Sequence, residues 1–155
     1  MTRIELLYDT PSAIPILAQW FVEEWRPWYG PDCGGDAEAD LLACRNHDRL
    51  PLAVIALNDE GQVLGTAALK NDALGSEFGY NPWLAAMLVG RRYRGAGIGS
   101  LLVSAIEHEA RRLGLSVIFA STYSVASILT RRGWTSTGEK TQSLRDPVSI
   151  YRLDL

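Results

Sequence analysis

The fold class is decided by the segment Arg91–Ser100, which reads RRYRGAGIGS. Glycine fills every second position from Gly95 to Gly99, and three arginines crowd just ahead. Glycine at this density indicates a backbone that turns where a Cβ would clash, or that approaches a ligand closely. An apolar stretch, 83–89, precedes the segment, and apolar residues at helical spacing follow it. A strand that leads into a helix this way is typical of an anion site, because the first-turn N–H groups are unpaired.

Three phosphate-binding patterns compete for this segment. A Walker A loop, GxxxxGK[ST], requires a lysine that is absent here. A dinucleotide fingerprint, GxGxxG, lacks its third glycine in Gly95–Ser100, and no acidic residue follows about 20 residues later. The pattern R-x-x-G-x-G fits Arg94–Gly99 without a gap. The structural alternative is a tight strand-to-helix turn whose glycines serve packing alone.

The rest of the chain predicts a mixed sheet with helices on its faces, in the α/β class and of α+β type. The unit 83–89, 97–113, 117–120 is a strand–helix–strand crossover, which should be parallel, whereas the hairpins around it should be antiparallel. The predicted order is β-α-α-β-β-β-α-β-α-β-β. The strands are expected at 3–8, 52–57, 63–70, 83–89, 117–120, 134–141 and 148–153, and the helices at 11–25, 36–44, 97–113 and 124–132.

Length and composition narrow the class of protein. A chain of 155 residues predicts a single domain, 1–155. The net charge of −3 argues against a general nucleic-acid binder. No apolar run approaches the roughly 18 residues of a membrane span, and the N-terminus has no signal-peptide core. Cys33 and Cys44 show no metal-ligand spacing, so we expect no metal and a cytoplasmic protein.

The R-x-x-G-x-G segment resembles the pyrophosphate loop of the GNAT superfamily of N-acetyltransferases, written Q/R-x-x-G-x-G/A. The preceding Met87-Leu88-Val89 resembles the strand that leads into that loop, and the element order is similar along nearly the whole chain. The resemblance implies a central sheet that is splayed between 83–89 and 117–120. It also implies transfer of an acetyl group from acetyl-CoA to a primary amine of a small cationic molecule, a peptide or a protein.

The resemblance also implies where coenzyme A binds. Its pantetheine arm would pair with backbone groups of Met87, Leu88 and Val89. Charge for the phosphates would come from Arg92 or Arg94, and Arg91 and Arg92 are candidates for the 3′-phosphate; the alternative for Arg91 and Arg92 is solvated surface. The pyrophosphate would lie on the loop and first helical turn, namely Arg94, Gly95, Ala96, Gly97, Ile98, Gly99 and Ser100.

The catalytic groups are predicted less directly. The backbone N–H of Val89 is the candidate for stabilising the oxyanion. Many family members carry a tyrosine, the thiolate acid, four residues before a Gly-aromatic pair; here that pair is Gly133-Trp134 and the position holds Leu129. Tyr123 is the substitute acid, with a packing aromatic as the alternative. Glu77 is the candidate base, with a solvated carboxylate as the alternative.

The acceptor wall is predicted in the first two helices and their connection. Between Glu23 and Asp40 there are six acidic residues and one basic residue, alongside several aromatic residues. Carboxylates and ring faces attract a cationic amine, so Trp28 and Tyr29 are candidates for binding the acceptor. The alternative is a core of aromatic residues with a solvated acidic face.

Other functions stay open from the sequence. The leucine at the usual tyrosine position leaves open a non-catalytic acyl-CoA-binding or sensing module. A nucleotide-dependent oxidoreductase that uses the glycine loop differently is a weaker alternative. The last two strands are compatible with a homodimer.

Overall fold

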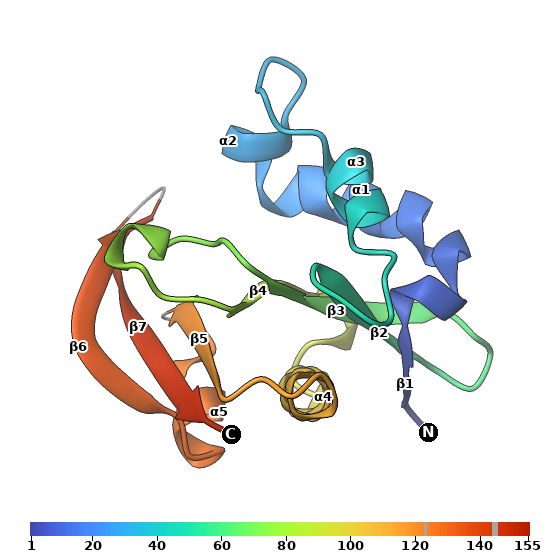
Figure 1. Cartoon of the computed structure of the whole chain (residues 1–155). Coiled ribbons are helices and arrows are strands. Elements are labelled where there is room, and N and C mark those ends of the chain that lie inside the picture. Colours follow the sequence, from blue (N-terminus) through green and yellow to red (C-terminus); the bar gives the residue numbers. More distant parts are fainter. Residues whose placement is uncertain (123, 144–145) are drawn as a thin grey trace.

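The computed structural model describes residues 1–122, 124–143 and 146–155. In this part of the chain, seven strands form one mixed sheet in the order β1-β2-β3-β4-β5-β7-β6 (Figure 1). The β4–β5 pair is parallel and the other pairs are antiparallel, as predicted. The strands are β1 (Arg3–Leu6), β2 (Leu52–Leu57), β3 (Val63–Lys70), β4 (Trp83–Val89), β5 (Val117–Thr122), β6 (Thr135–Gln142) and β7 (Pro147–Asp154).

Helices cover both faces of the sheet. Figure 1 shows α1, α2 and α3 above the half of the sheet that contains β1–β4, with α4 on the opposite face. The helices are α1 (Ile14–Glu24), α2 (Arg26–Tyr29), α3 (Ala37–Ala43), α4 (Ile98–Arg112) and α5 (Ala126–Arg131), with 3₁₀ turns at Leu7–Asp9, Pro11–Ala13, Ser76–Phe78 and Arg91–Tyr93. None of the described helices has the length and apolar character needed to cross a bilayer.

The alternation of β2 residues divides the core into two layers. Val54 and Ala56 pack in the cluster that includes α4, whereas Ala53 and Ile55 pack in the cluster that includes α1 and α3. Successive side chains of a strand point to opposite faces, so a strand covered by helices on both faces is apolar throughout. All six residues of β2 are buried, in agreement with this argument.

The predicted elements are confirmed, with differences at their ends. The first strand stops at Leu6 because the chain turns into a 3₁₀ helix at Leu7–Asp9. The short helix α2 was not predicted; Pro27 lies in its first turn, where the missing N–H of proline costs nothing. Asp36 caps α3 as expected, since its Oδ1 accepts a hydrogen bond of 3.0 Å from the N–H of Ala39.

The parallel contact between β4 and β5 is short. Trp83 pairs with Phe119, and the N–H of Phe119 donates to Pro82 O at 3.0 Å. No other ladder pair joins these strands among the described residues, although β4 stays paired with β3 up to Val89. The two strands therefore separate after Trp83, which is the splay that the family resemblance implied.

A bulge interrupts β4 beside this opening. Thr66 pairs with Leu88 and Ala68 pairs with Ala85, so β4 carries one residue more than β3 between these pairs. Ala86 in the bulge has a φ of +50°, which is uncommon for a residue with a Cβ. Backbone held in such a conformation is concentrated at functional sites. The bulge thus marks the middle of β4 as a place where its backbone is redirected.

Candidate active site

The glycine loop opens the helix α4 with a conformation that requires glycine. Gly95 and Gly97 have φ values of +83° and +81°, and Gly97 is the N-cap of α4. A Cβ on either residue would meet no heavy atom within 4 Å, so packing does not explain them. The loop therefore lies open and exposes the first N–H groups of a helix of 15 residues.

Gly99 differs from Gly95 and Gly97 because its neighbours are close. A Cβ at this position would lie 3.0 Å from Met87 Cε and 3.2 Å from Ile128 Cδ1. Gly99 therefore allows the first turn of α4 to lie close to both β4 and α5. The packing alternative applies to this glycine, whereas the backbone conformation explains Gly95 and Gly97.

Two of the arginines at the loop, Arg91 and Arg94, contact Glu24 at the end of α1. Arg94 Nε donates to Val89 O at 3.0 Å, and its Nη2 lies 3.3 Å from Glu24 Oε1. The second carboxylate oxygen of Glu24 lies 3.7 Å from Arg91 Nη2. Arg92 is exposed and its guanidinium lies 5.9 Å from the Tyr93 ring centroid. Glu24 thus supplies a counter-charge to two arginines, a contact across 70 residues of sequence that local patterns could not predict.

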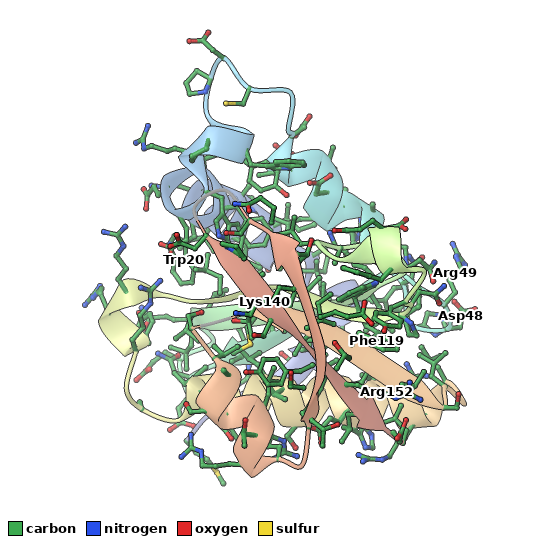
Figure 2. All side chains as sticks on the ribbon, turned by 90° about the vertical axis from the view of Figure 1, so that its left-hand side faces the viewer. Trp20, Asp48, Arg49, Phe119, Lys140 and Arg152 are labelled. Carbon is green, nitrogen blue, oxygen red and sulfur yellow. The ribbon has the colours of Figure 1, made fainter. Side chains whose placement is uncertain are left out.

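Trp20 supports the same loop from α1. A Cβ on Gly90 would lie 2.8 Å from Trp20 Cη2, so this residue leaves room for the indole ring. Figure 2 shows Trp20 beneath the ribbon of α1, on the side of the molecule that carries the turn 91–93. The exit from β4 and the end of α1 are therefore packed together.

The backbone of Val89 faces the opening between β4 and β5. The N–H of Gly90 donates to Leu64 O at 2.9 Å, which makes these residues a hydrogen-bonded pair of the antiparallel ladder. Such pairs alternate along a ladder, so the neighbouring pair Gly65–Val89 directs its N–H groups away from the partner strand. The N–H of Val89 is therefore directed toward the β5 side, which is compatible with its predicted role.

The residue at the usual position of the thiolate acid cannot donate a proton in this chain. Leu129 on α5 is fully buried and packs in the core cluster that includes α4. Trp134, from the Gly-aromatic pair, is also buried and donates its indole N–H to Glu107 at 3.0 Å. Tyr123, the predicted substitute acid, lies outside the described residues, so its role stays a prediction.

Glu77 lies on the exposed 3₁₀ turn that precedes β4. Thr141 Oγ1 on β6 donates to Glu77 Oε2 at 2.7 Å. This hydrogen bond, together with backbone N–H donors of the turn, lowers the pKa of Glu77. The base role of Glu77 stays a prediction.

The predicted acceptor residues differ in environment. Trp28 is 56% exposed, which is compatible with its predicted role. Tyr29 is half-buried, stacks on Phe21 at 6.0 Å and donates its hydroxyl to Asp40 Oδ2 at 2.6 Å. Burial and the bond to Asp40 raise the pKa of Tyr29 far above its ordinary value. Tyr29 is therefore a neutral donor that orients a carboxylate.

Comparisons with known proteins agree with this geometry. The model of the acetyltransferase (GNAT) family matches residues 14–128. A GCN5-related N-acetyltransferase from Kribbella flavida has a TM-score of 0.76 at 19% identity, over 99% of this chain and 98% of that one. An aminoglycoside 6′-N-acetyltransferase complexed with coenzyme A has a TM-score of 0.76 at 14% identity, over 98% and 96%. A protein from Salmonella typhimurium, solved with its cofactor acetyl-CoA, has a TM-score of 0.72 at 20% identity, over 99% and 94%. A search of curated proteins found no match.

The chain belongs to the acetyltransferase (GNAT) family and is an acyltransferase. The predicted family, fold class and enzyme class are confirmed. Among the residues that the structure describes, no group of three or more His, Cys, Asp or Glu side chains is placed to hold a metal.

Proposed function

We propose that the protein transfers the acetyl group of acetyl-CoA to a primary amine of a small cationic molecule, a peptide or a protein. The observation that carries this proposal is the open glycine–arginine loop at the start of α4, beside the opening between β4 and β5. A pyrophosphate fits such a loop, since Gly95 and Gly97 leave their surroundings clear and α4 offers its first N–H groups.

The residues proposed to hold the donor form one continuous path. Met87 and Val89 offer backbone groups to the pantetheine arm, where β4 has left β5. Leu88 alternates with Val89 and pairs with Thr66, so its backbone groups are directed toward β3 and it contributes to this site through its place in the strand. The pyrophosphate lies on 94–100, and Arg92 and Arg94 neutralise phosphate charge. Arg92 is exposed, whereas Arg94 must exchange its contact with Glu24 for the phosphate.

The chemistry proposed for this site is direct attack of a neutral amine on the thioester. The carbonyl oxygen gains negative charge in the transition state, and the N–H of Val89 is directed toward the side where this charge develops. A thiolate is a stable leaving group near neutral pH, so the buried leucine at 129 does not prevent turnover.

A cationic acceptor is supported by the wall above β4. The exposed ring of Trp28 offers a face to a cation, and the segment 23–40 carries six acidic residues against one basic residue. We also propose that the whole chain forms one domain that acts in the cytoplasm, which its two unpaired cysteines support. A homodimer stays a prediction; the outer strand β6 has an edge that could pair.

Two measurements test the proposed function. Millimolar acetyl-CoA should raise the melting temperature, because a ligand that binds the folded state stabilises it. Release of free thiol from acetyl-CoA should depend on an added amine, tested with polyamines, aminoglycosides and basic peptides. Stabilisation without thiol release for any amine would support an acyl-CoA-binding module instead, and no stabilisation would overturn the donor site.

A further inference from the structure

A small pocket lies between the acceptor wall and the bulge of β4. Its walls come from α1, α3, β2 and β3, and Ala86 of the bulge forms part of its lining. The polar side chains that line it are Asp40, Cys44, Thr66 and Lys70. Its volume of about 10 Å³ is at the lower limit of what can hold one water molecule. The pocket therefore places a water-sized space between these polar groups and the strand along which the donor is proposed to bind.

Among these groups, Asp40 is held in a defined orientation with one oxygen free. Tyr29 donates to its Oδ2, and the ring of Tyr29 is fixed by stacking on Phe21 and by contact with Trp25 at 6.5 Å. No hydrogen bond to the side-chain Oδ1 is made within the described part of the chain. Thr66 is engaged differently, since its hydroxyl donates to Val54 O at 2.8 Å.

We infer that Asp40 takes a proton from the acceptor amine through a water molecule held in this pocket. The inference rests on the proposed function. The acceptor ammonium gives one proton to the water, which passes a proton to Asp40 Oδ1. The nitrogen lone pair then forms the C–N bond and the C–S bond breaks with its electrons on sulfur. The second N–H proton protonates the thiolate, and Asp40 returns its proton to solvent.

The groups that face Asp40 determine how the reaction depends on pH. Tyr29 from α2 stays neutral because its pKa is raised, chiefly by burial. Burial likewise raises the pKa of the Cys44 thiol on α3, against the opposing effect of Lys70 on β3. These two groups are therefore protonated throughout the acidic range, and Lys70 contributes a positive charge. A general base must be unprotonated to act, so a base at this position gives the pH profile of kcat a limb on its acidic side.

The test measures kcat against pH, using the amine that gives the fastest thiol release. Asp40→Asn should lower kcat at pH 7 by about 100-fold, the usual scale of general-base catalysis. The wild-type profile should contain a limb that depends on the general base, and this limb should be lost in Asp40→Asn. The remaining rise of turnover with pH should follow only the fraction of amine that is neutral. Asp48→Asn is the matched control, since Asp48 is an exposed aspartate next to Arg49, on the side of the molecule opposite Trp20 (Figure 2).

The other variants separate this role from a merely structural one. Tyr29→Phe keeps the stacked ring but removes the hydrogen bond to Asp40, so kcat should fall roughly 3- to 10-fold with an unchanged KM for acetyl-CoA. Asp40→Glu should recover part of the rate lost in Asp40→Asn. Stabilisation by acetyl-CoA should persist in each variant, which shows that the fold and donor site are intact.

Unchanged kcat and an unchanged acidic limb in Asp40→Asn would overturn the inference. Loss of that limb in Glu77→Gln, but not in Asp40→Asn, would assign the proton to Glu77 instead. The proposed function fails in a different way, because the wild-type protein would then release no thiol with any amine.

Discussion

The two ends of β4 differ sharply although they belong to one strand. At the first end Trp83 is fully buried, pairs with Phe119 and donates its indole N–H to Tyr80 O at 2.7 Å. The ring of Tyr80 is stacked on that of Phe119 at 4.4 Å. The guanidinium of Arg152 lies 5.7 Å from the Phe119 ring centroid, and Figure 2 labels both of these residues. The last residue, Val89, instead leads into an exposed loop of glycine and arginine.

This difference explains how β4 can separate from β5 at one end while the two strands stay paired at the other. The packed aromatic end fixes where β4 and β5 meet, and the bulge at Ala86 lies between that point and the open end. Beyond the bulge, the N–H of Val89 is then directed toward the β5 side. We expect stability to be concentrated at the end that pairs with β5, whereas the proposed ligand site lies at the other end, which is the usual separation of scaffold and site.

The largest expected effect comes from a substitution at Trp83. This residue lies in the end of β4 that pairs with β5, here called the closed end. Trp83→Ala removes a fully buried indole, so the free energy of unfolding should fall by about 3–5 kcal/mol. Urea denaturation measures this change. Trp28→Ala is the control, because Trp28 is 56% exposed, and it should cost under about 1 kcal/mol. Equal losses in the two variants would contradict the assignment of the closed end as the stable one.

At the open end, Gly97→Val should remove most of the coenzyme affinity. A side chain on a residue with positive φ is strained, and it projects into the space proposed for the pyrophosphate. The Kd for acetyl-CoA should rise by about 100-fold, measured by calorimetry.

The control for this prediction is Gly114→Val at the other end of α4. Gly114 has a φ of +77° and equally open surroundings, so the backbone strain is matched. The coenzyme affinity of this variant should be unchanged. Affinity retained in Gly97→Val would show that the pyrophosphate lies elsewhere.

A smaller effect is expected from Gly99→Val, which acts through packing. Its side chain would press on the terminal atoms of Met87 and Ile128, so these side chains or the first turn of α4 must move. Overpacking of this kind should cost about 1–3 kcal/mol of stability and weaken coenzyme binding roughly 10-fold. Gly99→Ala adds only a Cβ and should show a fraction of both effects. If Gly99→Val bound acetyl-CoA as tightly as the wild type, coenzyme binding would not depend on the close contact between α4 and β4.

The smallest effect should come from Glu24→Gln, with the opposite sign. Glu24 holds Arg94 and Arg91, and its negative charge competes with the phosphates for them. Removing the charge should tighten acetyl-CoA binding about 3-fold, the scale of an exposed ion pair, and the gain should vanish at 1 M salt. Glu23→Gln on the same helix is the control. Weaker binding in Glu24→Gln would mean that Glu24 orients the arginines for the ligand.

Local patterns in the sequence predicted most of this fold. Apolar residues at period 2 and period 3.6 located β2, β3, β4 and α4, and the R-x-x-G-x-G motif indicated the donor loop. The helix α2 was missed because four residues are too few for a periodic signal. The end of β1 was missed because the turn at Leu7–Asp9 continues an apolar run.

The candidate site was less predictable because it depends on contacts between distant residues. Glu24 meets Arg94, and the orientation of Asp40 comes from Tyr29, neither of which follows from spacing. The bulge at Ala86 is a property of how β3 and β4 pair, not of an alanine in a strand. The exposed Glu77 was an obvious carboxylate in the sequence, whereas its bond to Thr141 required the folded chain.

Because Trp20 packs against Gly90, it is also an intrinsic fluorescence probe of the neighbouring loop. Indole emission responds to the polarity and charge around the ring, and Trp20 lies directly against the turn that enters the donor loop. An arginine that leaves Glu24 for a phosphate changes the electric field near this ring. Binding at the proposed donor site should therefore change the intrinsic fluorescence of the protein, without a label, through a tryptophan that lies outside the proposed acceptor contacts.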